Sequence, residues 1–434
     1  MASDYAAAPA LAAAPSRFDQ RMIEIGFVAV LLLIMVGLQP FDVRTAAALA
    51  ARDATTAGGD AVRQVAFLST FCMIGYGALS KRGIRAIAAV PPLVGLLLAW
   101  CFVSAFWTDE PDVVMRRAVL AAIFVFSMLM AVDALGTART LAIWRNVMAA
   151  IILGDIASSL LVHNAVHQPD DLEAGLAGAW RGLHSHKNMA GSVAAAATAM
   201  FFFFALETRR RSDVWLCLAS LFFLVMTRSK SSMGLLPAAL LAGFVYRAAW
   251  RSKLDRAIAA LALLLFGLAL TVAVAVEWQA ILQYVEDPQH FTGRTEIWAA
   301  EVNYIRDHPL FGAGFGTFGN TGVRSPIYRY VGPGWVAQIG EGHSGYLEML
   351  VTIGWLGFVI GMAGLLVQPF LQFWGRERRD TNFYALLFTL FVFDVLHNFM
   401  ESDFIQVTSA QWGQILLIIG LLHVSARETR EGRA

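Results

Sequence analysis

Residues 343 to 372 read HSGYLEMLVTIGWLGFVIGMAGLLVQPFLQ. After the opening His-Ser pair, Glu348 is the only charged residue in this stretch. A helix that crosses a bilayer needs about 20 mostly apolar residues. Residues 345–372 therefore predict a membrane span, and this prediction decides the fold class.

The rest of the chain repeats this pattern. The 434 residues are 58% hydrophobic and 15% charged, whereas soluble domains carry about 25% charged residues. We therefore predict an all-α polytopic membrane protein, with residues 1–16 as a disordered tail and 17–434 as a single transmembrane domain. The twelve predicted spans are 22–39, 62–80, 86–106, 113–133, 141–163, 189–206, 214–228, 232–249, 257–276, 345–372, 383–400 and 409–425.

The basic residues predict the orientation of these spans. If the N-terminus is cytoplasmic, the segments on that side carry 20 of the 33 Lys and Arg residues, and each carries at least two. An excess of basic residues in cytoplasmic segments is the usual pattern in membrane proteins. Both termini are thus predicted in the cytoplasm and the opposite face outside, which in a bacterium is the periplasm.

The longest connection, about residues 277–343, falls on the outer side. Membrane proteins seldom keep so long a segment between spans without using it. Arg294 and His343 lie toward its two ends, near the predicted lipid boundary. Other outward connections carry further polar clusters, at 107–111, 180–188, 227–232 and 397–403.

These residue types point to phosphate and hydroxyl chemistry. The planar guanidinium group of arginine suits a pyrophosphate. The candidate anion site therefore consists of the basic residues Arg181, Lys187, Arg228, Lys230 and Arg294. For Arg228 and Lys230, contact with anionic lipid headgroups is an equal alternative. His343 is a candidate general base because imidazole titrates near neutral pH.

We expect no metal and no cofactor. His184 and His186 are spaced His-x-His, but no second His-x-His pair accompanies them in their loop. Hydrogen bonding to sugar or phosphate is the preferred role for His186. The three cysteines all lie in apolar stretches, which argues against a zinc site or a disulfide framework.

Six short motifs, which follow the family's order along residues 100–405, resemble the O-antigen ligase and Wzy polymerase superfamily. Trp107-Thr108-Asp109-Glu110-Pro111 has Thr where the family has Ser and differs by one position in spacing. Thr227-Arg228-Ser229-Lys230-Ser231 has Lys230 where the family usually has Arg. The other motifs are Arg181-Gly182 with His186-Lys187-Asn188, Gly293-Arg294-Thr295-Glu296-Ile297-Trp298, Pro309 to Gly316, and His343-Ser344 followed by Gly354-Trp355-Leu356-Gly357.

The resemblance implies a metal-independent inverting glycosyltransferase of the GT-C type. Its donor would be a glycan on undecaprenyl pyrophosphate, held by Arg294 and other cations, while His343 activates the acceptor hydroxyl. Glu401 and Asp403, in Asn-Phe-Met-Glu-Ser-Asp, resemble an element of exopolysaccharide polymerases of the ExoQ type. They are expected to bind acceptor hydroxyls or to pair with the arginines.

Three functions stay open at this point. Polymerisation of lipid-linked repeat units in the bacterial inner membrane is preferred, with a flippase and a chain-length regulator as expected partners and no nucleic acid. Ligation of finished chains to lipid A core uses the same donor chemistry. Transport of the lipid-linked sugar is a third alternative, but transporters commonly show repeated halves, whereas here the polar motifs crowd one face and one large asymmetric loop.

Overall fold

The computed structural model describes residues 17–45, 60–171, 175–249, 294–319, 321, 324–332, 342–374 and 381–432. Its main helices are α1 (Arg17–Met35), α3 (Ala61–Arg82), α4 (Pro92–Val103), α5 (Pro111–Leu135), α6 (Thr137–Leu161), α7 (Lys187–Thr208), α8 (Arg211–Thr227), α9 (Lys230–Ala249), α12 (Arg294–Asp307), α13 (Gly345–Met362), α14 (Gln368–Trp374), α15 (Thr381–His397) and α16 (Ala410–Arg430). Eleven of the twelve predicted spans coincide with these helices, and the span at 257–276 lies outside the described residues.

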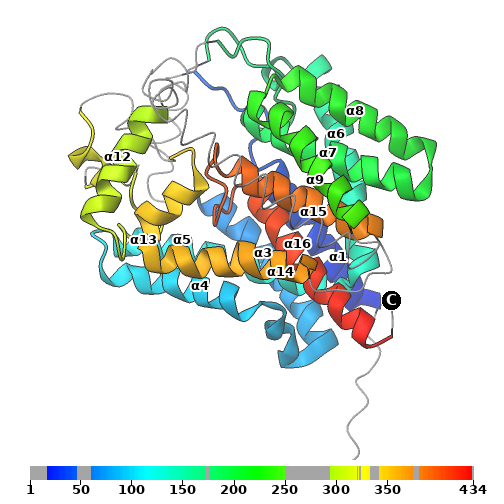
Figure 1. Ribbon diagram of the computed structural model, residues 1–434, viewed down its shortest axis with the longest axis horizontal. Coiled ribbons are helices and arrows are strands. Elements are labelled where there is room, and N and C mark those ends of the chain that lie inside the picture. Colours follow the sequence, from blue (N-terminus) through cyan, green and yellow to red (C-terminus); the bar gives the residue numbers. More distant parts are fainter. Residues whose placement is uncertain are drawn as a thin grey trace, which may run out of the picture.

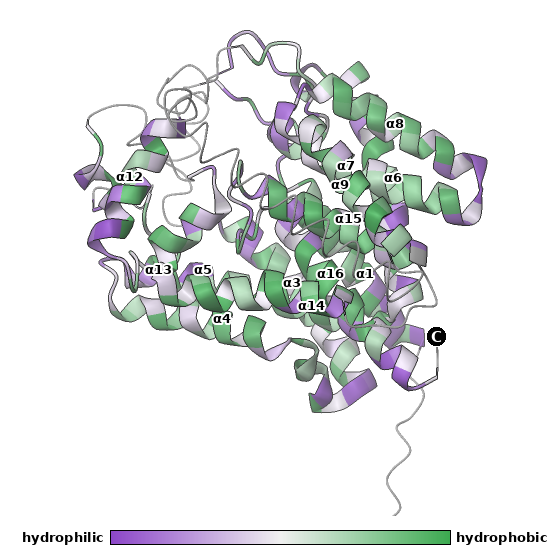
Figure 2. Cartoon of the chain, in the orientation of Figure 1, coloured by the Kyte–Doolittle hydropathy of each residue, from purple (hydrophilic) through white to green (hydrophobic). Residues whose placement is uncertain are grey.

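The prediction of an all-α polytopic membrane protein is confirmed. Six helical runs within the described ranges are long and apolar enough to cross a membrane, and two further apolar helices are shorter. The six runs are Ala61–Ala89, Pro111–Leu135, Thr137–Leu161, Lys187–Thr208, Lys230–Ala249 and Gly345–Trp374. Hydrophilic residues gather at helix ends and in the connecting segments (Figure 2).

Helix α16 lies in the middle of the bundle. Its side chains are buried from Ala410 to Leu422, and it packs against α5, α7 and α15. Figure 1 shows α4, α12 and α13 on one side of this centre and α6 to α9 on the other.

Part of the predicted 277–343 connection is helical. Helix α12 forms because Ile297, Ala300 and Tyr304 recur at helical spacing and bury one face. A short 3-10 turn follows at Pro326–Arg329. Residues 277–293 and 333–341 of that connection lie outside the described residues.

Helix α13 is broken at Gly354, which has φ 66° and ψ −176°. The Gly-rich segment 309–316 pairs with the backbone that this break exposes. Ala313 N donates to Val351 O at 2.8 Å, Gly314 N donates to Thr352 O at 2.9 Å, and Trp355 N donates to Pro309 O at 2.8 Å. Freed backbone groups at membrane depth need such partners, so the two motifs Pro309–Gly316 and Gly354–Gly357 form one structural joint.

Candidate functional site

Glu401 lies between Arg294 and His343. Its Oε1 is 2.8 Å from Arg294 Nη2 and its Oε2 is 3.2 Å from His343 Nδ1. Asn188 Nδ2 also donates to Glu401 Oε1, at 2.9 Å. Four residues predicted from the sequence thus meet in one cluster, although they come from separate parts of the chain. Arg294 begins α12 and His343 comes two residues before α13. Glu401 follows α15, and Asn188 lies at the start of α7.

Backbone contacts fix this arrangement. Gly345 N donates to Asn398 O at 2.8 Å and to Glu401 O at 3.0 Å, and Ser344 N donates to Ser402 Oγ at 3.1 Å. A Cβ on Gly345 would lie 2.1 Å from Asn398 Oδ1. The close approach that only glycine allows therefore brings the start of α13 onto the turn that carries Glu401.

The cluster keeps its carboxylate charged. Burial by itself would raise the pKa of Glu401, but the hydrogen bond with His343 and the positive charge of Arg294 outweigh it and hold this pKa well below its ordinary value. The side chains of Arg294 and Glu401 are 14% and 16% exposed, whereas that of His343 is 35% exposed. The imidazole is thus the most accessible member of this trio.

Asp403 belongs to a neighbouring pair. Its Oδ2 is 2.7 Å from His397 Nδ1 and its Oδ1 accepts from Ser409 Oγ at 2.8 Å. Both Asp403 and His397 are buried. Asp403 and Glu401 therefore have different surroundings, although only one residue separates them in the sequence.

The start of α7 connects the cluster with a buried histidine. His186 Nδ1 accepts from Asn188 N at 3.2 Å and caps the helix. Lys187 N donates to His167 Nε2 at 3.2 Å, while His167 Nδ1 is 2.5 Å from Asp171 Oδ2. Burial lowers the pKa of His167 to about 4, against the opposing effect of Asp171.

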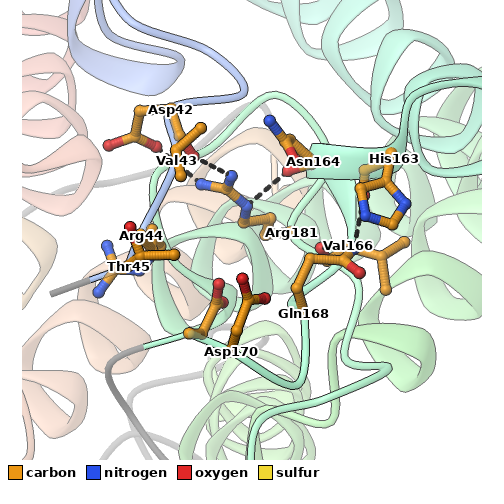
Figure 3. Close-up of a pocket in the computed structure, with 11 residues that line it drawn as sticks. Asp42, Val43, Arg44, Thr45, His163, Asn164, Val166, Gln168, Asp170 and Arg181 are labelled. Atoms are coloured by element: carbon orange, nitrogen blue, oxygen red, sulfur yellow. Dashed lines mark hydrogen bonds and ion pairs between the residues drawn. The ribbon is translucent and has the colours of Figure 1, made fainter. Parts of the chain in front are cut away.

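Arg181 lies apart from the Glu401 cluster. It is 3% exposed, its Nη1 is 2.8 Å from Asp42 Oδ1, and its Nε donates to Asn164 O at 2.7 Å. Figure 3 shows it on the wall of a polar cavity of about 220 Å³, between residues 42–45 and 163–171. In the described residues Arg181 joins two connecting segments, and its predicted substrate role stays a prediction.

Arg228 and Lys230 are exposed at the turn between α8 and α9. Arg228 has φ 52° and ends α8, and its Nη1 donates to Ala177 O at 3.3 Å. Lys187 Nζ donates to Arg228 O at 3.3 Å. The turn thus contacts the residue next to Asn188, so the predicted cations at 187, 228 and 230 lie in adjoining segments.

The sequence analysis did not predict two residues that shape the site, Asn398 and His167. Asn398 accepts backbone N–H groups of Asp403 and Phe404 at 3.2 and 3.0 Å and shapes the turn that carries Glu401. His167 had one local signal, since it lies four residues before Asp171 and meets it. Within the described ranges no group of three or more His, Cys, Asp or Glu side chains is arranged to hold a metal ion.

The fold and this cluster define a polytopic membrane protein with an ionic site where several helix ends meet. Residues 215–362 match the family model described as O-antigen ligase. This match confirms the resemblance to the O-antigen ligase and Wzy polymerase superfamily and indicates ligase or polymerase activity on polysaccharide. A comparison with curated proteins finds no match.

Proposed function

We propose that the protein polymerises oligosaccharide repeat units carried on undecaprenyl pyrophosphate, at the periplasmic face of the bacterial inner membrane. The observation that supports this most is the convergence of Arg294, His343 and Glu401. A cation for the leaving group and an imidazole for the nucleophile are the two elements that glycosyl transfer from a pyrophosphate needs. The O-antigen ligase match includes both Arg294 and His343.

His343 is suited to take a proton. Its Nδ1 faces the charged Glu401 at 3.2 Å, which favours the tautomer with the proton on Nδ1. The Nε2 lone pair of this tautomer accepts the proton of an acceptor hydroxyl. A carboxylate that orients an imidazole and stabilises the imidazolium works in the same way in serine hydrolases.

Arg294 is suited to hold the pyrophosphate. It uses two of its five N–H donors on Met400 O and Glu401 Oε1. The other donors of the planar guanidinium match phosphate oxygens. Positive charge is added in the adjoining segments by Lys187, Arg228 and Lys230. We propose that Arg181 holds the neighbouring loop in a position where it faces the glycan.

In the proposed reaction the acceptor oxygen attacks the anomeric carbon as the bond from that carbon to the pyrophosphate oxygen breaks. The leaving pyrophosphate takes the electron pair, and His343 takes the hydroxyl proton. Attack opposite the leaving group inverts the anomeric configuration. We propose that no metal takes part, so EDTA leaves the rate unchanged.

Arg294→Ala and His343→Ala test the two roles. Each variant is expected to lose at least about 10²-fold in transfer rate while still inserting in the membrane, because each removes charge stabilisation or base catalysis. The measurement is product length after reaction of purified protein in liposomes with lipid-linked oligosaccharide. Arg306→Ala, at the exposed far end of the same helix α12, is the matched control.

The same assay separates an enzyme from a transporter. Product lengthening supports the proposal. Movement of the lipid-linked sugar between leaflets without lengthening would overturn it. A near-normal rate in Arg294→Ala would refute the pyrophosphate role of that residue.

Ligation to lipid A core is the second candidate, since the family match has the O-antigen ligase description. Deletion of the gene distinguishes the two. Loss of long polymer with normally capped lipopolysaccharide supports polymerisation. Long polymer that accumulates on the lipid carrier supports ligation. A flippase and a chain-length regulator are proposed partners of the polymerase.

A further inference from the structure

Side chains hold both backbone polar groups of Gly342, the residue just before His343. Trp298 Nε1, on α12, donates to Gly342 O at 3.0 Å. Gly342 N donates to Glu348 Oε2, in the first turn of α13, at 3.1 Å. Gly342 is therefore fixed between two helices, and His343 is its direct neighbour in the chain.

A third contact comes from Glu301 on α12. A Cβ built on Gly342 would lie 1.8 Å from Glu301 Oε1, so the carboxyl group fills the space where a side chain would be. Gly342 is thus enclosed by Trp298, Glu301 and Glu348.

Glu301 is unusual among the described acidic residues. It is fully buried at 0% exposure, and neither carboxyl oxygen has a hydrogen-bond partner in the described part of the chain. Burial raises the pKa of Glu301 well above its ordinary value, and the nearby Glu348 raises it further. Burial thus favours the neutral form of Glu301, because an unpaired buried charge is strongly unfavourable.

His343 needs such support. Its φ of 54° is in the left-handed region, which is costly for a residue with a Cβ and persists only where the surroundings impose it. The imidazole is also 35% exposed, and its polar contact within the described residues is with Glu401. Its direction therefore depends on the backbone that carries it.

We propose that Glu301 and Glu348 are positioning residues that hold the Gly342 peptide and thereby direct the His343 ring toward Glu401. Glu348 supplies the acceptor for the peptide N–H, and Glu301 supplies a neutral wall against the Gly342 Cα. The expected effect of this positioning on catalysis rests on the proposed role of His343 as the base. The positioning of the His343 ring does not depend on that role.

A double-mutant cycle on Gly342 and Glu301 tests the contact. Gly342→Ala places a methyl group where the Glu301 carboxyl lies, and Glu301→Ala vacates that space. We expect each single variant to lower kcat about tenfold with little change in KM, which is about 1.4 kcal/mol of barrier. The double variant is expected to recover most of the loss of Gly342→Ala, because the new methyl group then fits.

The ring itself is observed by NMR of ¹³C-labelled histidine in detergent, with the His343 signal identified by its loss in His343→Gln. Gly342→Ala and Glu348→Ala are expected to move the titration midpoint of this signal, while Glu296→Gln, on the exposed face of the same helix α12, leaves it in place. Glu301→Gln keeps the neutral shape and is expected to match the wild type in kcat and titration.

Two results would overturn the proposal. One is an unchanged His343 titration in folded Gly342→Ala and Glu348→Ala. The other is a Glu301→Gln variant as impaired as Glu301→Ala, since it would mean that Glu301 acts as a charged group. If His343→Ala retains full transfer activity while the titration still responds to Gly342, the proposed function fails and the positioning contact stands.

Discussion

Glu401 contacts both residues that the proposed reaction uses, so one negative charge acts on the proposed base and on the proposed pyrophosphate ligand. Glu401→Gln keeps the shape but removes the charge that orients His343 and pairs with Arg294. We expect kcat to fall about 10²–10⁴-fold, the usual contribution of a positioned base. The KM for the lipid-linked donor is expected not to rise, because Arg294 loses a competing anion. Steady-state kinetics in liposomes measure both constants.

Glu296→Gln makes the same chemical change at an exposed position of α12 and serves as the control. Its kinetics are expected to match the wild type. A Glu401→Gln variant with unchanged kcat and a raised KM would show that Glu401 binds substrate instead of orienting His343.

The lowered pKa of His167 predicts that the stability of the folded protein depends on pH. Its pKa is about 4 in the folded protein, against about 6.5 in an unfolded chain. Between these values the unfolded state binds more protons, so stability rises with pH, is complete above about 6.5 and is lost as pH falls toward 4. Burial explains the sign, since the charged imidazolium is disfavoured away from water.

Thermal unfolding in detergent micelles at pH 4.5 and 7 measures this effect. His167→Gln is expected to show a smaller difference in midpoint between the two pH values than the wild type. His163→Gln, at an exposed histidine in the same loop, is the control and is expected to keep the full difference. Equal differences in wild type and His167→Gln would contradict the assignment.

For single residues, the sequence shows which side chains are polar in an otherwise apolar chain. It does not predict which other side chains they contact. Arg294, His343 and Glu401 were singled out from the sequence, and they meet. Arg181 was singled out for the same reasons, yet its donors are used on Asp42 and Asn164. The difference depends on long-range contacts such as Arg181 with Asp42 and Arg294 with Glu401, which are 139 and 107 residues apart and which no local pattern encodes.

At the scale of elements, the joint at Gly354 couples α13 to the segment 309–316. Gly354 has φ 66° with ψ near 180°, a combination almost restricted to glycine. A Cβ there would also lie 2.3 Å from Leu310 O. Gly354→Ala is therefore expected to destabilise the protein by about 1–3 kcal/mol or more, seen as a lower thermal midpoint in detergent.

Gly234→Ala is the matched control in a regular helix. A Cβ at this position of α9 meets nothing within 4 Å, and Ala is favoured over Gly in helices by about 1 kcal/mol. Its midpoint is expected to stay equal or rise. A Gly354→Ala protein as stable as the wild type would show that the break in α13 does not require glycine.

The helices themselves were more predictable than their interruptions. Apolar length predicts the eleven spans that coincide with described helices, because the bilayer constraint acts on each span separately. Helix α12 was expected as part of a connection, since its 14 residues are too short to span a membrane and its apolar face is narrow. The apolar face of α12 is buried because it packs against α13, a contact that the sequence of α12 alone does not predict.

At the scale of the whole molecule, the basic residues predict which face of the bundle lies in the cytoplasm. Arg210, between α7 and α8, belongs to a segment with three consecutive arginines, whereas Arg329 follows α12 on the side of the proposed site. Both are exposed. A cysteine at either position therefore reports sidedness, once Cys72, Cys101 and Cys217 are replaced by alanine.

In spheroplasts, a membrane-impermeant thiol reagent is expected to label Arg329→Cys at once and Arg210→Cys only after the membrane is permeabilised. This follows because basic segments are retained in the cytoplasm during insertion. Retained transfer activity in both variants checks that the fold is intact. The opposite labelling pattern would place Arg294 and His343 in the cytoplasm, where acceptors exposed at the outer face cannot reach them, and the proposed periplasmic polymerisation would fail with it.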